Sequence, residues 1–194
     1  MATLIDAAPT AAIPAGYPRE LEREIRLQDG AAAQIRPIRP DDAERLIELY
    51  DRLSYTTAYQ RFFRVLKRLP PEWARLFANV DYHGRLALVA QHDAPHGPEL
   101  VGVARYEPSD EPGTVEVAVV VQDGWQGRGL GVMLLGDLLA AAEARGIHLF
   151  CAFVLADNSR MLDMLARFTR VQKRTIDSGV VEIIFMPRAQ PVSA

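Results

Sequence analysis

A glycine-rich segment, Gln126-Gly127-Arg128-Gly129-Leu130-Gly131, lies between two regular patterns of the chain. An apolar, β-branched run, Val115–Val121, precedes it, and residues 130–145 follow with helical periodicity. A turn from a strand into a helix leaves main-chain N–H groups without internal partners, and the helix dipole adds partial positive charge there. The segment therefore predicts an anion site, best suited to a phosphate or a diphosphate.

Two other phosphate motifs do not fit this segment. A Rossmann fingerprint requires a third glycine where Val132 stands. A Walker loop requires a lysine followed by serine or threonine, and neither follows here. A plain strand-to-helix turn with a solvated Arg128 is the alternative to an anion site.

Glu116 is the candidate for acid–base chemistry. Alternation along its run places Val115, Val117, Val119 and Val121 on one strand face and Glu116 on the other. An unpaired carboxylate among valines is costly to bury, so we expect Glu116 to face a cleft or to pair with an arginine. In a cleft its pKa would rise, which suits a general base. A structural ion pair or an exposed strand charge is the alternative.

Other polar residues give weaker indications of a site. Asn158 precedes a helical pattern, where capping the helix is as good an explanation as ligand binding. Cys151 stands in an apolar strand and is interpreted as a core residue. The histidines lack metal-ligand spacing, so no metal site is predicted. A basic and aromatic stretch at residues 61–68 is interpreted as a solvated helix face.

Composition is that of a globular protein with a core of ordinary size. The 194 residues carry a net charge of −3, which does not favour nucleic-acid binding, and one cysteine, which fits a reducing compartment. Neither a signal peptide nor a membrane-spanning run of about 20 apolar residues is evident, so a cytoplasmic protein is expected. Residues 1–18 and 189–194 are predicted as tails around one domain, 19–188.

Periodicity and turn residues predict the elements that must position these groups. The helices are expected from Asp41, with a capping box to Glu44, over residues 55–66 and 71–77, over 130–145, and after a cap at Asp157. The strands are expected at residues 23–27, 32–38, 86–91, 100–106, 114–121, 147–155, 170–174 and 180–186. This order predicts an α/β fold with a mixed sheet.

The pattern Gln126-x-x-Gly129-x-Gly131 and the order of elements resemble the GNAT superfamily of N-acetyltransferases over residues 22–188. The resemblance implies a mostly antiparallel sheet with helices on both faces and a central strand pair that splays apart. It implies acetyl-CoA as the acyl donor, with its pantetheine arm in the gap. The cofactor residues it implies are Val119, Val121, Gln126, Gly127, Arg128, Gly129, Leu130, Gly131 and Asn158.

The same resemblance implies that Glu116 removes a proton from the acceptor amine. The chain departs from the family at Leu165, where many members carry a tyrosine that protonates the leaving thiolate. A thiol pKa near about 8.5 allows the thiolate to leave without an acid, so no general acid is assigned.

Local similarity indicates the class of acceptor. Ile35-Arg36-Pro37-Ile38-Arg39-Pro40-Asp41-Asp42, Tyr59-Gln60-Arg61-Phe62-Phe63 and the Glu116 region are similar to bacterial protein-lysine acetyltransferases. The resemblance therefore implies a protein lysine as acceptor. A small amine, such as an antibiotic, a polyamine or an amino acid, is the alternative, and a non-catalytic acyl-CoA sensor is another.

Overall fold

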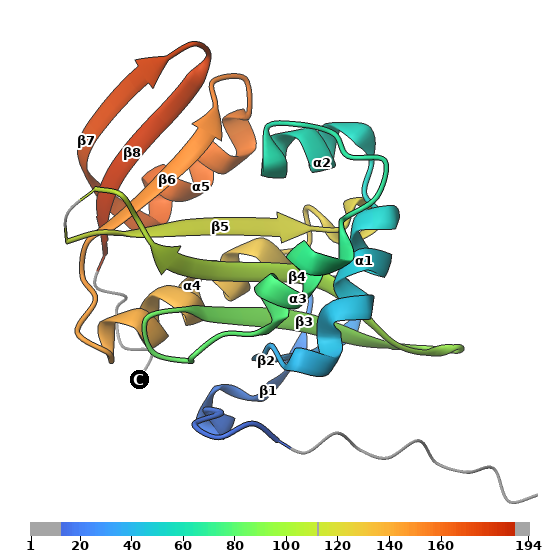
Figure 1. Ribbon diagram of the computed structural model, residues 1–194. Coiled ribbons are helices and arrows are strands. Elements are labelled where there is room, and N and C mark those ends of the chain that lie inside the picture. Colours follow the sequence, from blue (N-terminus) through green and yellow to red (C-terminus); the bar gives the residue numbers. More distant parts are fainter. Residues whose placement is uncertain (1–12, 112, 189–194) are drawn as a thin grey trace, which may run out of the picture.

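The computed structural model describes residues 13–111 and 113–188, which form one mixed sheet with helices on both faces (Figure 1). The eight strands lie in the order β1-β2-β3-β4-β5-β6-β8-β7, and only β5 and β6 run parallel. The predicted fold class is confirmed. The strands are Arg23–Arg26 (β1), Ala32–Pro37 (β2), Leu86–Ala94 (β3), Gly97–Pro108 (β4), Val115–Val121 (β5), Phe150–Leu155 (β6), Thr169–Asp177 (β7) and Val180–Pro187 (β8).

The helices cover the two faces of the sheet unequally. One face carries three short helices, and the other carries a long central helix and a helix against the last strands (Figure 1). They are Ala43–Asp51 (α1), Tyr55–Phe62 (α2) and Pro71–Ala78 (α3) on the first face, and Leu130–Glu143 (α4) and Ser159–Phe168 (α5) on the second. Short 3₁₀ turns cover Arg19–Leu21 (η1), Pro40–Asp42 (η2) and Asp123–Trp125 (η3).

Strands β5 and β6 pair over only two residue positions. Val115 pairs with Phe150 and Glu116 with Cys151, and no further pairs follow. Strand β5 stays fully paired with β4 along its other edge, from Val115 to Val121. Consequently the β6 side of β5 beyond Glu116 has main-chain groups without a strand partner, and the predicted splay is present.

Several element boundaries differ from the prediction for local reasons. Helix α2 ends at Phe62 because Phe63 adopts a left-handed conformation, with φ of 54°. Strands β3 and β4 continue through the predicted loop to a tight turn between Ala94 and Gly97. Tyr17, placed in the predicted tail, is buried and donates a hydrogen bond to Glu22 Oε1. The ordered domain therefore begins before residue 17. The predicted tail segments 1–12 and 189–194 lie outside the described residues.

The start of α1 is held by Asp42 rather than by the predicted box between Asp41 and Glu44. The Asp42 carboxylate is fully buried and accepts two hydrogen bonds of 2.7 Å from the Arg36 guanidinium and one of 2.8 Å from the Arg39 main-chain N–H. Burial works against the charged form, but these hydrogen bonds and the charge of Arg36 outweigh it and lower the pKa of Asp42. This ion pair ties strand β2 to the first helix.

Removal of the Asp42 carboxylate tests this ion pair. We expect Asp42→Ala to lower the free energy of unfolding by about 3–5 kcal/mol, because it leaves Arg36 charged and buried. Since folding lowers the pKa of Asp42, the loss is expected at neutral pH and is expected to shrink below about pH 4. Urea denaturation measures both. The exposed neighbour supplies the control, as Asp41→Ala should change stability by no more than about 0.5 kcal/mol. Equal effects of the two substitutions would contradict the assignment.

Candidate active site

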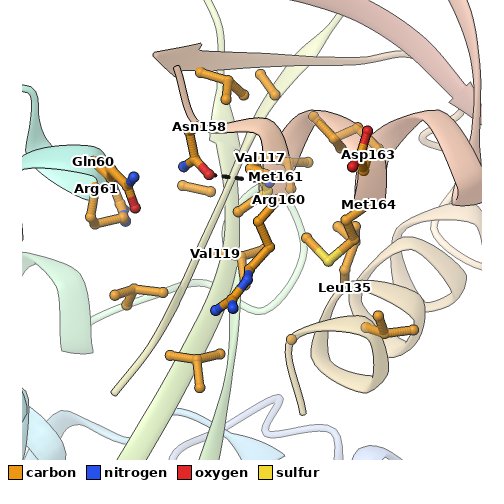
Figure 2. A pocket seen from close by; sticks show the side chains of 18 of the residues that line it. Gln60, Arg61, Val117, Val119, Leu135, Asn158, Arg160, Met161, Asp163 and Met164 are labelled. Carbon is orange, nitrogen blue, oxygen red and sulfur yellow. Dashed lines mark hydrogen bonds between the residues drawn. The ribbon is translucent and has the colours of Figure 1, made fainter. Parts of the chain in front are cut away.

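The gap between β5 and β6 opens into a cleft of about 430 Å³ (Figure 2). Its walls come from β5, β6, α2, α5 and the turn into α4, and this volume is in the range of ligand pockets. Most of the surface is apolar, contributed by β5, β6 and the inner side of α5. The residues that line it and enter the argument are Arg61, Glu116, Val119, Val121, Gln126, Gly127, Gly129, Gly131, Asn158, Arg160 and Leu165.

The glycine turn forms one end of this cleft. Gly127 and Gly129 have φ of 75° and 92°, a region that side chains with a Cβ rarely adopt. Gly129 is the N-cap of α4 and supplies no side-chain cap, so the first N–H groups of the helix are free for a ligand. A Cβ on Gly131 would meet no protein atom closer than 3.6 Å. The fold therefore does not require glycine at 131, whereas close approach of a ligand would.

Seven of the predicted cofactor residues line the cleft and two do not. Arg128 Nη1 lies 3.0 Å from the Asp29 carboxylate in the turn between β1 and β2, and its guanidinium is 5.4 Å from the centre of the Trp125 ring. The Arg128 side chain therefore lies away from the cleft. Leu130 is buried in the core beneath α4. The seven that line it are Val119, Val121, Gln126, Gly127, Gly129, Gly131 and Asn158.

Gln126 connects three walls of the cleft through its side-chain amide. Its Nε2 donates to the Val121 carbonyl at 2.9 Å and to Thr57 Oγ1 of α2 at 3.2 Å. Its Oε1 accepts a 2.7 Å hydrogen bond from Arg160 of α5. The side chain predicted to touch the cofactor therefore holds β5, α2 and α5 in place around it.

Helix α2 begins at the same end of the cleft. Ser54 caps the helix by accepting from the Thr57 N–H, and its own N–H and hydroxyl donate to Asp123 at 2.8 and 2.7 Å. The Thr57 hydroxyl donates to Asp123 as well. Burial opposes the charged form of Asp123, but these hydrogen bonds lower its pKa. This network fixes the start of α2 beside the glycine turn.

Asn158 and Arg160 bring α5 to the mouth of the cleft. Asn158 Oδ1 accepts from the Met161 N–H at 3.2 Å and is the N-cap of α5, the position predicted for Asp157 (Figure 2). The capping explanation of Asn158 is thus correct, and the residue also lines the cleft. Arg160 was not predicted. The available signal was its place two residues after Asn158, in the first turn of a helix expected beside the predicted anion site.

Glu116 lies at the opposite end of β5 from the glycine turn and lines the cleft. Its carboxylate makes no ion pair with any described residue. Glu116 is exposed to solvent within the open cleft, and the partial cover that the cleft walls give its carboxyl group raises its pKa above the ordinary value. Arg61 on α2 opposes this shift, and Glu107 on the neighbouring strand adds to it. Glu107 stands directly opposite Glu116 in the antiparallel register, which explains its influence. A carboxylate with a raised pKa in a cleft can act as a general base.

Arg61 is the second cleft residue that the sequence analysis did not assign. It extends from the last turn of α2 towards the cleft, whereas Arg64, Lys67 and Arg68 are exposed (Figure 2). Arg64, Lys67 and Arg68 are solvated as expected, but they follow the end of α2 and so do not form a helix face. The interpretation is wrong for Arg61, which is on the helix and lines the cleft. Burial lowers the pKa of Arg61 to about 10, so its side chain is still charged at neutral pH. The sequence clue to this role was that Arg61 stands four residues after Thr57 and therefore on the same face of the helix, and Thr57 also lines the cleft.

Two further expectations concern residues near Glu116. Leu165 is buried in the cleft wall, so an aliphatic side chain occupies the position where a tyrosine would stand. Cys151 is fully buried, and its thiol donates to Ser109 Oγ at 3.2 Å, as befits a core residue. Among residues 13–111 and 113–188, no cluster of three or more His, Cys, Asp or Glu is arranged to hold a metal.

In the same described ranges no helix has the length and apolarity needed to cross a membrane.

Comparison with known proteins identifies the family. The model of the acetyltransferase (GNAT) family matches residues 44–169, which include both the glycine turn and Glu116. The chain belongs to this family and is an N-acetyltransferase. Its acyl donor is acetyl-CoA, and the cleft fits that molecule: free N–H groups at the glycine turn suit the diphosphate, and the apolar walls and unpaired edge of β5 suit the pantetheine arm.

Individual relatives cover most of the chain. It is 32% identical over 153 residues to acetyltransferase PA5475 of Pseudomonas aeruginosa, covering 79% of this chain and 82% of that one. It is 35% identical over 158 residues to acetyltransferase Pat of Mycolicibacterium smegmatis, covering 81% of this chain. The chain spans only 46% of that relative's length. The GNAT domain of S. lividans PAT superposes with a TM-score of 0.77 at 36% identity, covering 88% of this chain and 99% of that one.

A shorter similarity concerns a different type of acceptor. Over 55 residues the chain is 40% identical to the L-methionine sulfoximine/L-methionine sulfone acetyltransferase of Pseudomonas aeruginosa. The match covers 28% of this chain and 32% of that relative.

Substitution of Gly131 tests whether the glycine turn binds the acyl donor. Gly131→Val should raise the dissociation constant of acetyl-CoA by about tenfold or more, because Gly131 lines the cleft and the valine methyl groups would extend beyond a Cβ that already contacts Val121 and Met164. Isothermal titration calorimetry measures this constant. Gly131→Ala is the matched control, expected to bind more tightly than the valine variant and to melt at the wild-type temperature. Wild-type affinity in the valine variant would place the cofactor elsewhere.

Proposed function

We propose that this protein transfers the acetyl group of acetyl-CoA to a primary amine of a protein lysine, with Glu116 as the general base. The observation that carries the proposal is the position of Glu116. Its carboxylate faces the cleft, has no ion-pair partner among the described residues, and lies in the cleft that begins at the glycine turn. A cytoplasmic location, expected from the sequence, belongs to this proposal.

The proposed reaction follows from the arrangement of the cleft. The diphosphate lies at the N–H groups of residues 127–131, and the pantetheine arm lies along the open edge of β5 beside Val119 and Val121. This direction places the thioester near Glu116. Main-chain N–H groups of β5 that lack a strand partner are suited to polarise the thioester carbonyl. Holding both reactants in one cleft supplies a large part of the rate.

Glu116 makes the amine reactive. An alkylamine with a pKa near about 10.4 is mostly protonated at neutral pH and cannot attack a thioester until it loses a proton. Glu116 accepts this proton, the amine nitrogen forms a bond to the carbonyl carbon, and the carbon–sulfur bond breaks with its electron pair passing to sulfur. The second proton that the nitrogen loses on becoming an amide passes to solvent through the open cleft. Leu165 offers no proton, so coenzyme A leaves as the thiolate, which a thiol pKa near about 8.5 permits.

The outer face of α2 supports a protein as the acceptor. Tyr55 and Tyr59 of α2 are 72% and 41% exposed, and their rings stack with their centres 6.4 Å apart. Phe63, which follows α2 and lines the cleft, is 38% exposed. Exposed aromatic side chains of this kind are typical of protein-binding surfaces. The similarity to acetyltransferase Pat and to the GNAT domain of PAT supports the same class of acceptor.

A small amine is the second candidate acceptor. The similarity to the L-methionine sulfoximine/L-methionine sulfone acetyltransferase favours an amino acid or a related compound. The Arg61 guanidinium lies in the cleft and interacts with the charge of Glu116. A positive and a negative side chain together suit a small zwitterion. Both candidates share the same donor site and the same base.

Labelled acetyl-CoA distinguishes the two acceptors. We expect that incubation of a cell lysate with the protein and isotope-labelled acetyl-CoA places label on protein lysines, detected by mass spectrometry of peptides and of the small-molecule fraction. Glu116→Gln is the control, expected to lower transfer by about 10²-fold or more at neutral pH while acetyl-CoA binding persists. Label confined to small amines would support the second candidate. Unchanged transfer by the glutamine variant would remove Glu116 from the mechanism.

A further inference from the structure

Two arginines meet at a second, smaller cavity beside the active-site cleft. This cavity has a volume of about 40 Å³ and shares Arg61, Ala118 and Val120 with the cleft. Its volume is enough for a group of the size of a carboxylate or a few waters. Except for the arginine groups and the tyrosine hydroxyl, its lining is apolar: Leu46, Leu49, Tyr50, Leu53, Phe62, Phe77, Val103, Ala118 and Val120, with Arg61 and Arg105.

Neither guanidinium is fully satisfied by the protein. That of Arg61 makes no hydrogen bond or ion pair with any described residue, and its central carbon lies 5.0 Å from the centre of the Phe62 ring. Arg105 is buried, lies 4.5 Å from the Phe77 ring centre and pairs with Glu107, yet its Nε has no partner. The Arg61 side chain is only partly buried, so its donors are accessible to a ligand, whereas the Nε of Arg105 is a buried donor whose lack of an acceptor is costly. An acceptor from a ligand in this cavity would satisfy both.

The position of Arg61 shows which ligand it faces. Helix α2 starts at the glycine turn, where Asp123 holds Ser54, and it ends at Phe62. Eight residues of helix span about 12 Å, so the last turn lies well away from the diphosphate end of the cleft. The charges that influence Arg61 are those of Arg105, Glu116 and Glu107. Arg61 therefore faces the acceptor rather than the phosphates of the donor.

We propose that Arg61, with Arg105 behind it, binds a carboxylate of the acceptor while Glu116 receives the proton from the acceptor's amine. The inference rests on the proposed function and names the acceptor chemistry of that same site. The carboxylate is either the α-carboxylate of an amino acid or an acidic side chain next to the acetylated lysine in a protein. In both cases the acceptor carries its amine and a carboxylate close together in one molecule.

Charge and shape favour a carboxylate over other groups at this position. An ammonium would meet two positive charges in an apolar cavity, and an apolar group would leave the Arg61 guanidinium and the Nε of Arg105 without acceptors. Arginine binds a planar carboxylate through two parallel N–H groups, and such charge-assisted hydrogen bonds are about twice as strong as neutral ones. The occupied subsite would also hold the amine in a fixed position relative to Glu116.

Matched pairs of acceptors test the proposal. One set compares amino acids with their α-carboxamides, and the other compares lysine peptides that carry Asp or Asn beside the lysine. In at least one set the wild-type kcat/KM should favour the carboxylate member by about tenfold to a hundredfold. Arg61→Gln should abolish this preference, and Arg61→Lys should retain part of it because it keeps the charge without the planar fork. The set that shows the preference identifies the source.

Arg64→Gln is the matched control, because Arg64 is exposed, stacks over Trp73 and lines neither cavity. It should keep the wild-type preference. Equal kcat/KM for both members of every pair, a preference that survives in Arg61→Gln, or acetylation only of amines without a carboxylate would overturn the inference and leave the proposed function intact. Absence of transfer to any amine, with acetyl-CoA still bound, would overturn the proposed function and this inference with it.

A pH profile separates a role in the site from a purely structural one. Arg61 lowers the pKa of Glu116, so its removal should move the acidic limb of kcat/KM to higher pH, where the carboxylate now becomes protonated. The other charges that influence Glu116 are Glu107, Arg105 and Asp110, and they are unchanged in this variant. Arg64→Gln should leave the limb in place. An unmoved limb in Arg61→Gln would contradict the placement of Arg61 beside the base.

Discussion

The early separation of β5 from β6 is the constraint on which the site depends. After two paired positions the strands diverge, and the edge of β5 loses its partner while β4 still holds the strand straight on the other side. A sheet that closed here would satisfy more main-chain groups and leave no cleft. The protein instead keeps donors free along this edge, where the proposed thioester cofactor would supply the missing contacts. At the start of α4 the glycine turn likewise leaves main-chain N–H groups without a side-chain cap.

The walls of the opening are tied together by side chains rather than by the sheet. Gln126 joins β5, α2 and α5, and Asp123 fixes the start of α2 beside the glycine turn. The same hydrogen bonds of Gln126 and Asp123 therefore position both the glycine-turn end of the cleft and helix α2, which leads to its other end. A change in the turn would be transmitted along α2 to Arg61 and, from there, to the charge balance around Glu116.

Local sequence patterns were sufficient for the fold, and most of the site residues that they predicted line the candidate cleft. Alternating valines placed Glu116 on the open face, and a glycine turn between a strand and a helix gave the anion site. Tertiary partners decided the rest. Arg128 pairs with Asp29, which lies in a hairpin turn distant in sequence. Arg61 lines the cleft from the last turn of α2, which ends earlier than predicted because Phe63 is left-handed. Such choices depend on which charge lies nearby in space, and the residue order alone does not contain that information.

The central claim is that main-chain N–H groups of the glycine turn hold the diphosphate of the donor. The most direct measurement compares coenzyme A with pantetheine, which lacks the diphosphate and nucleotide, by calorimetry and by amide NMR of the labelled protein. The account predicts that coenzyme A binds at least about a hundredfold more tightly and that it alone shifts the amide resonances of Gly127, Gly129 and Gly131. Equal affinities, or unshifted glycine resonances in the coenzyme A complex, would contradict it.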